Sequence, residues 1–264
     1  MTIRRIKKMA LFKVNFFSES LGMESSVIVV MPQKSVAGQI GLQSSCPDND
    51  YKVLYLLHGL SDDETIWMRR TSIERYASRY GIVVVMPNGH RSFYTDMKHG
   101  GKYYEYITHE LPIRIKEFFR ISGKRENTYI AGLSMGGYGA LKAALREPGK
   151  YAAASGLSAV VDIDGFSHSR PELFGAIFGN DLTIPEDDDL YKLIEKHKND
   201  NVKPRLFIGI GKQDGLYDQN QPFRKVLADN GYDLTYRESD GVHSWEFWDE
   251  YILYTLEWMF GGKR

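Results

Sequence analysis

Gly132-Leu133-Ser134-Met135-Gly136 joins a short apolar run to a helical segment. Residues 128–131 before it predict a buried strand, and residues 137–146 after it predict a helix. The glycines are needed because such a turn is too tight for side chains on either side of the serine. The turn lifts the Ser134 hydroxyl to a helix N-terminus, where the helix dipole favours negative charge. This arrangement predicts a nucleophilic serine, although a plain turn of small residues is the structural alternative.

Apolar runs alternate with amphipathic segments along the rest of the chain. Seven strands are predicted, at residues 27–31, 52–57, 82–86, 128–131, 152–156, 205–209 and 234–238. Five helices are predicted, at residues 71–80, 110–119, 137–146, 221–230 and 244–260. Continuously apolar strands are typical of a parallel sheet covered on both faces. We therefore expect one α/β domain over residues 1–264, built on a doubly wound, mostly parallel sheet.

One interval, residues 158–204, is too long for a single crossover helix. It carries Phe174, Ile177 and Phe178 among glycines and prolines, and long connections at the carboxyl edge of a parallel sheet often form lids. We expect this interval to form a cap whose three apolar side chains contact the substrate. Its acidic run, residues 186–189, is interpreted as the solvated first turn of a helix, with a cation site as the alternative.

The balance of charge excludes several classes of partner. The chain has 34 Lys and Arg residues against 34 Asp and Glu residues, so neither nucleic acid nor an acidic membrane surface is expected as a partner. No apolar run approaches the roughly 20 residues of a membrane span. No histidine, cysteine or acidic residues have the spacing of a metal site, and no cofactor is predicted.

The ends and the single cysteine favour a cytoplasmic location. Residues 1–8 are basic and are interpreted as a flexible extension. Residues 9–17 lack the uninterrupted apolar core of a signal peptide. Cys46 cannot form an internal disulfide, which fits a reducing compartment.

Two residues downstream of Ser134 have the placement of catalytic partners. A serine hydroxyl needs a base within hydrogen-bond reach. Asp214 and His243 each follow a predicted strand, so both are expected at the carboxyl edge of the sheet with Ser134. We expect His243 to be the base and Asp214 the acid that orients it. Asp218 is the alternative acid, and a turn aspartate with a surface histidine is the non-catalytic alternative.

The strand at residues 52–57 leads into His58-Gly59-Leu60. Acyl transfer needs donors for the developing oxyanion, and the loop at this place in the fold supplies one of them. We assign the oxyanion hole to the backbone N–H groups of Leu60 and Met135. His58 is expected to fix the loop instead of acting as the base, because it lies early in the chain.

The run His58-Gly59-Leu60-Ser61-Asp62-Asp63-Glu64-Thr65-Ile66-Trp67 resembles the oxyanion loop of the esterase D group of serine esterases. The serine motif at residues 132–140 and the segments around Asp214 and His243 are similar to the same group, over about residues 12–260. Within the group the chain most resembles bacterial tributyrin esterases. The resemblance implies the α/β-hydrolase fold and hydrolysis of short-chain acyl esters, with Ser134, Asp214 and His243 as the triad.

We therefore expect a serine carboxylesterase that acts on small-molecule esters through an acyl-enzyme intermediate. Trp67 and Tyr138 are expected to border the acyl pocket together with the aromatic residues of the cap. The alternatives are a carbohydrate acetyl or feruloyl esterase, an S-formylglutathione hydrolase, and a catalytically silent binding protein on the same scaffold. The sequence is compatible with a homo-oligomer and with a monomer.

Overall fold

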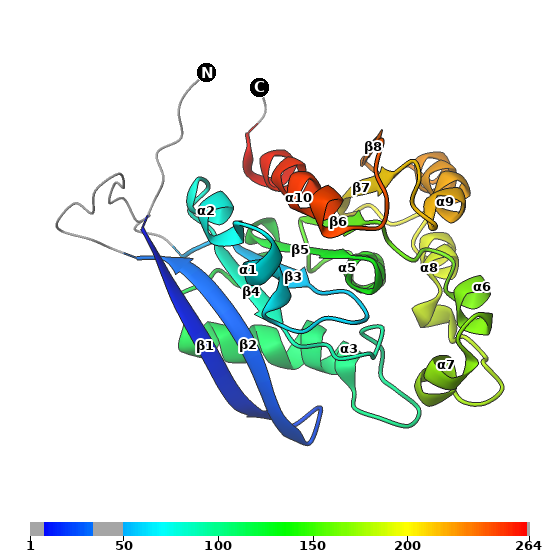
Figure 1. Ribbon diagram of the computed structural model, residues 1–264, viewed down its shortest axis with the longest axis horizontal. Helices are drawn as coiled ribbons and strands as arrows, with labels where there is room; N and C mark the ends of the chain where they lie inside the picture. Colours follow the sequence, from blue (N-terminus) through cyan, green and yellow to red (C-terminus); the bar gives the residue numbers. More distant parts are fainter. Residues whose placement is uncertain (1–7, 34–49, 263–264) are drawn as a thin grey trace.

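The computed structural model describes residues 8–33 and 50–262, which build one eight-stranded sheet with helices on both faces (Figure 1). The strand order is β1-β2-β4-β3-β5-β6-β7-β8. The strands are β1 (Met9–Ser18), β2 (Met23–Pro32), β3 (Val53–Leu57), β4 (Val83–Pro87), β5 (Thr128–Leu133), β6 (Ala153–Leu157), β7 (Arg205–Gly211) and β8 (Leu234–Ser239). β3 to β8 pair in parallel, whereas β1 and β2 form an antiparallel hairpin beside β4. The predicted mostly parallel α/β sheet is confirmed.

Each of the seven predicted strands corresponds to one of β2 to β8, but β1 was not predicted. β1 is an edge strand whose apolar side chains are partly solvated, with Leu11 56%, Phe12 39% and Phe17 51% exposed. It therefore lacks the clean alternation that marks a half-buried strand. Residues 1–7 of the predicted extension, and Cys46, lie outside the described residues.

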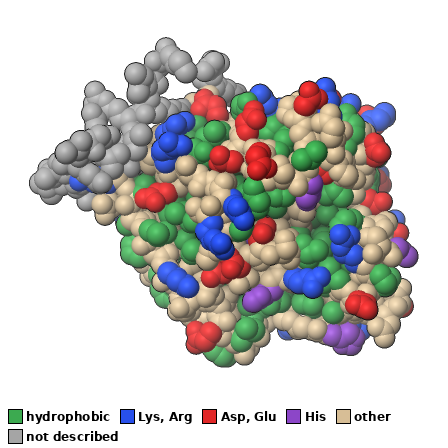
Figure 2. Space-filling model, viewed as in Figure 1, with side chains coloured by type: hydrophobic (Ala, Val, Ile, Leu, Met, Phe, Trp, Pro, Cys, Tyr) green, Lys and Arg blue, Asp and Glu red, His purple; other side chains and the backbone are tan. Residues whose placement is uncertain are grey.

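Two apolar cores lie on the two faces of the sheet. One face is covered by α1 (Ile66–Arg70), α2 (Ile73–Ser78) and α10 (Trp245–Phe260). The other is covered by α4 (Leu111–Phe118), α5 (Met135–Arg146), α8 (Leu190–Lys196) and α9 (Tyr217–Asp229). α3 (Tyr103–Glu105) runs through a π-helical turn, Tyr106–Glu110, into α4. Figure 2 shows acidic and basic side chains interspersed on the face seen in Figure 1.

The interval at residues 158–204 forms α6 (Ile163–His168), α7 (Pro171–Phe178), a short 3-10 turn (Glu186–Asp188) and α8. The expectation that the acidic run is a solvated first turn is wrong for Asp188, which is 7% exposed. The Asp188 carboxylate accepts a 2.7 Å hydrogen bond from the ammonium of Lys142 on α5, a side chain that is itself fully buried. A buried ammonium needs a counter-charge, so this carboxylate ties the 3-10 turn to α5. Asp189 caps α8 by accepting from the N–H groups of Tyr191 and Lys192.

Among the described residues, no helix combines the length and the apolar character needed to cross a membrane.

Candidate active site

Ser134 occupies a strained turn between β5 and α5. Its backbone has φ 52° and ψ −117°, a conformation that L-residues rarely adopt and that clusters at functional sites. A Cβ on Gly132 would lie 2.3 Å from the carbonyl oxygen of Gly136, and a Cβ on Gly136 would lie 2.6 Å from that of Leu57. Both glycines are therefore required by close backbone approach, and the Ser134 N–H is held by a 2.8 Å bond to the carbonyl of Leu157.

Three loops at the carboxyl edge of the sheet bring together Ser134, His243 and Asp214. His243 Nε2 lies 3.0 Å from Ser134 Oγ. His243 Nδ1 lies 2.9 Å and 3.1 Å from the two carboxylate oxygens of Asp214. The alternative acid, Asp218, lies further along in the first turn of α9, and it is Asp214 that contacts His243. The geometry is that of a nucleophile, a base and an orienting acid.

Asp214 is buried, with 5% of the residue exposed. Its carboxylate accepts several hydrogen bonds. The backbone N–H of Leu216 donates to it at 2.9 Å, and the hydroxyl of Ser158 and the ring of His243 also donate to it. Burial by itself would raise the pKa of Asp214, but these hydrogen bonds and the charge of His243 outweigh burial and lower the pKa. Asp214 is therefore held ionised beside the imidazole.

Ser158 and Trp248 contact Asp214 and His243, respectively, and are hydrogen-bonded to each other. Ser158, directly after β6, has φ 46°, and its Oγ accepts a 3.1 Å hydrogen bond from Trp248 Nε1. The Trp248 ring packs edge-on against the His243 imidazole, with ring centroids 4.8 Å apart and an 89° angle between the planes. Ser158 is not among the predicted site residues, although its position immediately after a strand, at the same edge of the sheet, is a signal in the sequence.

The loop after β3 passes directly against the serine turn. A Cβ on Gly59 would lie 2.7 Å from Leu133 Cδ1 and 3.9 Å from Ser134 Cβ. Leu60 lines the pocket that contains Ser134, and Met135 is the first residue of α5. The two backbones assigned to the oxyanion hole therefore flank the serine.

His58 holds this loop. Its Nε2 accepts a 2.8 Å bond from the N–H of Gly89, so its Nδ1 carries the hydrogen that bonds the Gly59 carbonyl at 2.7 Å. Burial lowers the pKa of His58 to about 4, so the ring stays neutral. Tyr94 donates its hydroxyl to the His58 carbonyl at 2.9 Å. His58 and Tyr94 thus fix the position of the loop that carries Leu60.

Ser134 lines a cavity of about 1030 Å³. Its aromatic lining comes from the loop after β4, from the cap and from α10. These lining residues are Phe93, Phe166, Trp245 and Trp248. Its charged lining, apart from the Asp214 and His243 pair, consists of Asp62, Arg70, Arg91, Arg170 and Glu246.

The five residues expected to contact the acyl group do not line this cavity; the residues concerned are Trp67, Tyr138, Phe174, Ile177 and Phe178. Trp67 lies behind Trp245, with ring centroids 5.2 Å apart, and donates its indole N–H to the Leu57 carbonyl. Phe174 packs against the pocket residue Phe93 at 4.7 Å. Each side chain is turned into the core, where burial of a large apolar surface stabilises it most.

Tyr138 faces the core for a second reason, because its hydroxyl donates to the Asp188 carbonyl at 2.6 Å. Of the pocket aromatics, Phe166 belongs to the interval whose aromatic residues are expected at the acyl pocket, whereas Phe93 is not predicted from the sequence; both lie in irregular or short segments. Residue spacing in such segments does not show which side chain faces a cavity.

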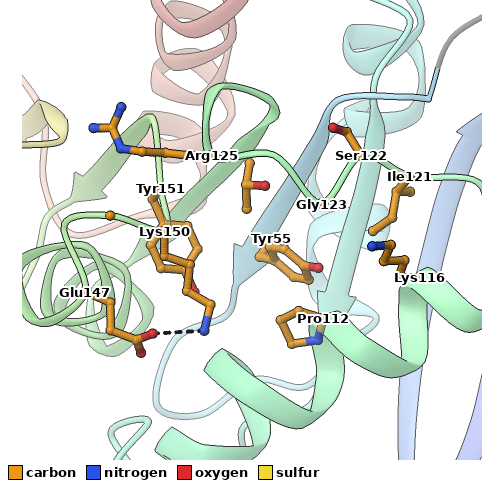
Figure 3. Close-up of a pocket in the computed structure, with 12 residues that line it drawn as sticks. Tyr55, Pro112, Lys116, Ile121, Ser122, Gly123, Arg125, Glu147, Lys150 and Tyr151 are labelled. Carbon is orange, nitrogen blue, oxygen red and sulfur yellow. Dashed lines mark hydrogen bonds and ion pairs between the residues drawn. The ribbon is translucent and has the colours of Figure 1, made fainter.

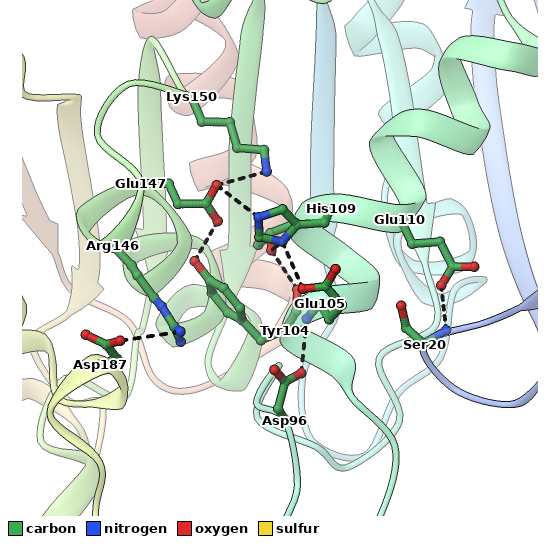
Figure 4. Close-up of polar contacts among 11 residues, drawn as sticks. Ser20, Asp96, Tyr104, Glu105, His109, Glu110, Arg146, Glu147, Lys150 and Asp187 are labelled. Carbon is green, nitrogen blue, oxygen red and sulfur yellow. Dashed lines mark hydrogen bonds and ion pairs between the residues drawn. The ribbon is translucent and has the colours of Figure 1, made fainter.

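A second cavity, of about 420 Å³, lies beside α4 and the C-terminal end of α5 and contains none of the triad residues (Figure 3). Lys150 pairs with Glu147 at its edge at 3.0 Å. Glu147 also accepts from the Tyr104 hydroxyl at 2.8 Å and lies 3.6 Å from His109 (Figure 4). This polar cluster connects α5 to α3 and the π-helical turn.

Over residues 8–33 and 50–262, no group of three or more His, Cys, Asp or Glu side chains is placed to hold a metal ion.

Comparison with known proteins identifies the family. The Esterase family, described as "Putative esterase", matches residues 18–259. An acetyl esterase of Caldicellulosiruptor saccharolyticus is 30% identical, over 95% of this chain and 98% of that protein. The structure of S-formylglutathione hydrolase (FrmB) from Staphylococcus aureus is 36% identical with a TM-score of 0.84, over 96% of this chain and 100% of that one. The fluorophosphonate-binding serine hydrolase FphF of the same organism has the same identity and TM-score, over 96% of this chain and 98% of that one. A family model that matches nearly the whole chain, together with relatives of 30% and 36% identity over at least 95% of it, shows that this chain belongs to the Esterase family, as an esterase of the α/β-hydrolase type.

Proposed function

We propose that this protein is a serine carboxylesterase that hydrolyses short-chain acyl esters through an acyl-enzyme formed on Ser134. The observation that carries the proposal is the unbroken line of contacts from Ser134 Oγ to His243 Nε2 at 3.0 Å, and from His243 Nδ1 to Asp214 at 2.9 Å. Membership of the Esterase family supports the same reaction class. The intact triad argues against a catalytically silent binding protein.

The mechanism follows from these contacts. His243 Nε2 accepts the proton of the Ser134 hydroxyl as Oγ attacks the ester carbonyl carbon. The carbonyl oxygen becomes an oxyanion, which receives hydrogen bonds from the backbone N–H groups of Leu60 and Met135. Asp214 stabilises the imidazolium, which then donates its proton to the departing alcohol oxygen. Water attacks the acyl-enzyme, with His243 again accepting a proton, and the acid leaves as Ser134 is regenerated.

The preference for short acyl groups is part of the proposal. Phe93, Phe166 and Trp248 line the same cavity as Ser134, and such large rings restrict the length of an acyl chain. The relative named acetyl esterase supports a small acyl group. A thioester is the second candidate substrate, because the 36% identical Staphylococcus aureus protein is named S-formylglutathione hydrolase. The cytoplasmic location and the relation to tributyrin esterases stay predictions of the sequence.

A substrate panel tests this proposal. We expect kcat/KM for 4-nitrophenyl acetate and butyrate to exceed that for the octanoate by about tenfold or more, since each methylene in a pocket has a substantial effect. S-formylglutathione assayed in parallel separates the ester from the thioester. Ser134→Ala, with an unchanged circular dichroism spectrum, should lose activity on every substrate. A folded Ser134→Ala variant with wild-type turnover would refute the proposal.

A further inference from the structure

Some of the basic side chains that line the catalytic cavity have an acidic neighbour, and others do not. Arg70 interacts electrostatically with both Asp62 and Glu246. In the described part of the chain, Arg91 and Arg170 form no ion pair with a carboxylate, although both line the cavity. Two guanidinium groups therefore face the substrate space without a counter-charge.

Both of these arginines belong to one wall of the cavity. Arg91 precedes Phe93 by two residues, and the guanidinium of Arg170 lies 4.6 Å from the centre of the Phe166 ring. The Phe93 and Phe166 rings are 5.9 Å apart, so the two segments that carry the arginines are in contact. Asp62, Arg70 and Glu246 lie in the other segments that line the cavity, the loop after β3, α1 and α10.

The wall is built to hold its position. Ser92 donates its hydroxyl to the Gly89 carbonyl at 2.6 Å and accepts from the N–H of Tyr94 at 2.9 Å. Phe93 and Tyr94 both have positive φ, at 51° and 52°, in a segment whose side chains are buried. Arg170 also donates to the Ser169 hydroxyl at 3.2 Å and stacks on Phe166, which limits the freedom of its side chain.

We propose that the natural substrate carries a carboxylate, which Arg91 and Arg170 bind while the ester carbonyl lies at Ser134. This inference rests on the proposed function and narrows its substrate class. A guanidinium group pairs with a carboxylate through two parallel N–H donors. Arg91 and Arg170 are both exposed, so a carboxylate that enters the cavity can reach them. The carboxylate belongs either to the acid or to the alcohol portion of the ester, and these two sources are separated by the test.

The test compares isosteric esters that differ in charge. For the acid portion, 4-nitrophenyl hydrogen succinate is compared with 4-nitrophenyl 4-oxopentanoate. For the alcohol portion, 4-acetoxybenzoate is compared with 4-acetoxyacetophenone. Each kcat/KM is measured after subtraction of the uncatalysed rate, for the wild type and for Arg91→Gln, Arg170→Gln and Arg114→Gln. Arg114 is the matched control, because it lies on α4 outside the cavity and pairs with Glu117.

We expect the ratio of anionic to neutral kcat/KM to fall about tenfold or more in Arg91→Gln and in Arg170→Gln, in one of the two ester pairs. In the wild type this ratio should also fall as salt is raised, because added ions screen the attraction. Ratios in both variants equal to that of Arg114→Gln, in both ester pairs, would overturn the inference. If the wild type still hydrolyses the neutral esters at Ser134, that result leaves the proposed function standing. A wild-type protein that hydrolyses none of the esters would refute the proposed function itself.

Discussion

At the scale of single residues, the site contains two buried groups that both lack their titratable proton, one of them charged and the other neutral. The proposed triad needs an ionised Asp214: burial raises the pKa of Asp214, but the hydrogen bonds from His243, Leu216 and Ser158 outweigh burial and lower it. His58 must be neutral to accept from Gly89, and burial lowers its pKa to about 4. Each protonation state is thus fixed by the surroundings of the group.

The first prediction concerns the acid. Asp214→Asn should lower kcat by about 10⁴-fold, because an amide favours the wrong tautomer of His243 and cannot stabilise the imidazolium. Asp218→Asn is the matched control, an aspartate in the first turn of α9, and should change kcat little. Both values come from steady-state hydrolysis of 4-nitrophenyl butyrate. The opposite ranking would transfer the acid role to Asp218.

The second prediction concerns pH and His58. Its pKa falls from 6.5 to about 4 on folding, so between these values the unfolded chain binds a proton that the folded chain does not. The free energy of unfolding should therefore decrease as the pH falls from about 6.5 to about 4, by a few kcal/mol from this one group. Urea unfolding at several pH values measures it. His58→Gln should weaken this pH dependence, and an unchanged slope in a folded variant would contradict the assignment.

At the scale of elements, aromatic rings from the loop after β4, from α6 and from α7 form an inner and an outer layer beside the catalytic cavity. Phe93 and Phe166 line the catalytic cavity, and Phe174 packs behind both, 4.7 Å and 6.1 Å away between ring centroids. Phe174 is fully buried, as is Tyr138 on α5. We therefore expect Phe93 and Phe166 to contact the substrate, and Phe174 and Tyr138 to stabilise the fold.

The third prediction separates these layers. Phe166→Ala should raise kcat/KM for the octanoate ester relative to the acetate by about tenfold, because it enlarges the cavity beside Ser134. Phe174→Ala should instead lower the stability by about 3–5 kcal/mol, the cost typical of an emptied core position, with a smaller change in chain-length preference. Measuring kcat/KM against acyl-chain length, together with the melting temperature, for both variants distinguishes substrate contact from a role in stability. A reversed pattern would show that Phe174 contacts the acyl chain.

At the scale of the whole molecule, the features that could be predicted from the sequence are those with a local signal. The apolar runs of β2 to β8 and the glycines around Ser134 reflect short-range constraints on the backbone. Asp214 and His243 follow strands, so their common edge follows from the parallel sheet, and the structure places them within hydrogen-bond reach.

The remaining features depend on contacts between distant segments. Ser158 reaches Asp214 and Trp248 through the fold, and the orientation of Trp67 is decided by Trp245, far along the chain. Nothing in the sequence of the acidic run indicates that Asp188 pairs with the buried ammonium of Lys142, so the sequence alone predicts a solvated turn. Residue type and periodicity carry no information on which of several aromatic side chains faces a cavity.

The most direct measurement of the central claim is the site at which a fluorophosphonate probe modifies the protein. Only an activated serine reacts readily with such a probe, since the probe mimics the ester carbonyl at which Oγ attacks. Intact mass spectrometry should show one added probe group on the wild type, peptide mapping should locate it on Ser134, and ester hydrolysis should be lost in proportion to labelling. Ser134→Ala should remain folded and unlabelled. Labelling of a residue other than Ser134, or full ester hydrolysis by the labelled protein, would contradict the assignment of Ser134 as the nucleophile.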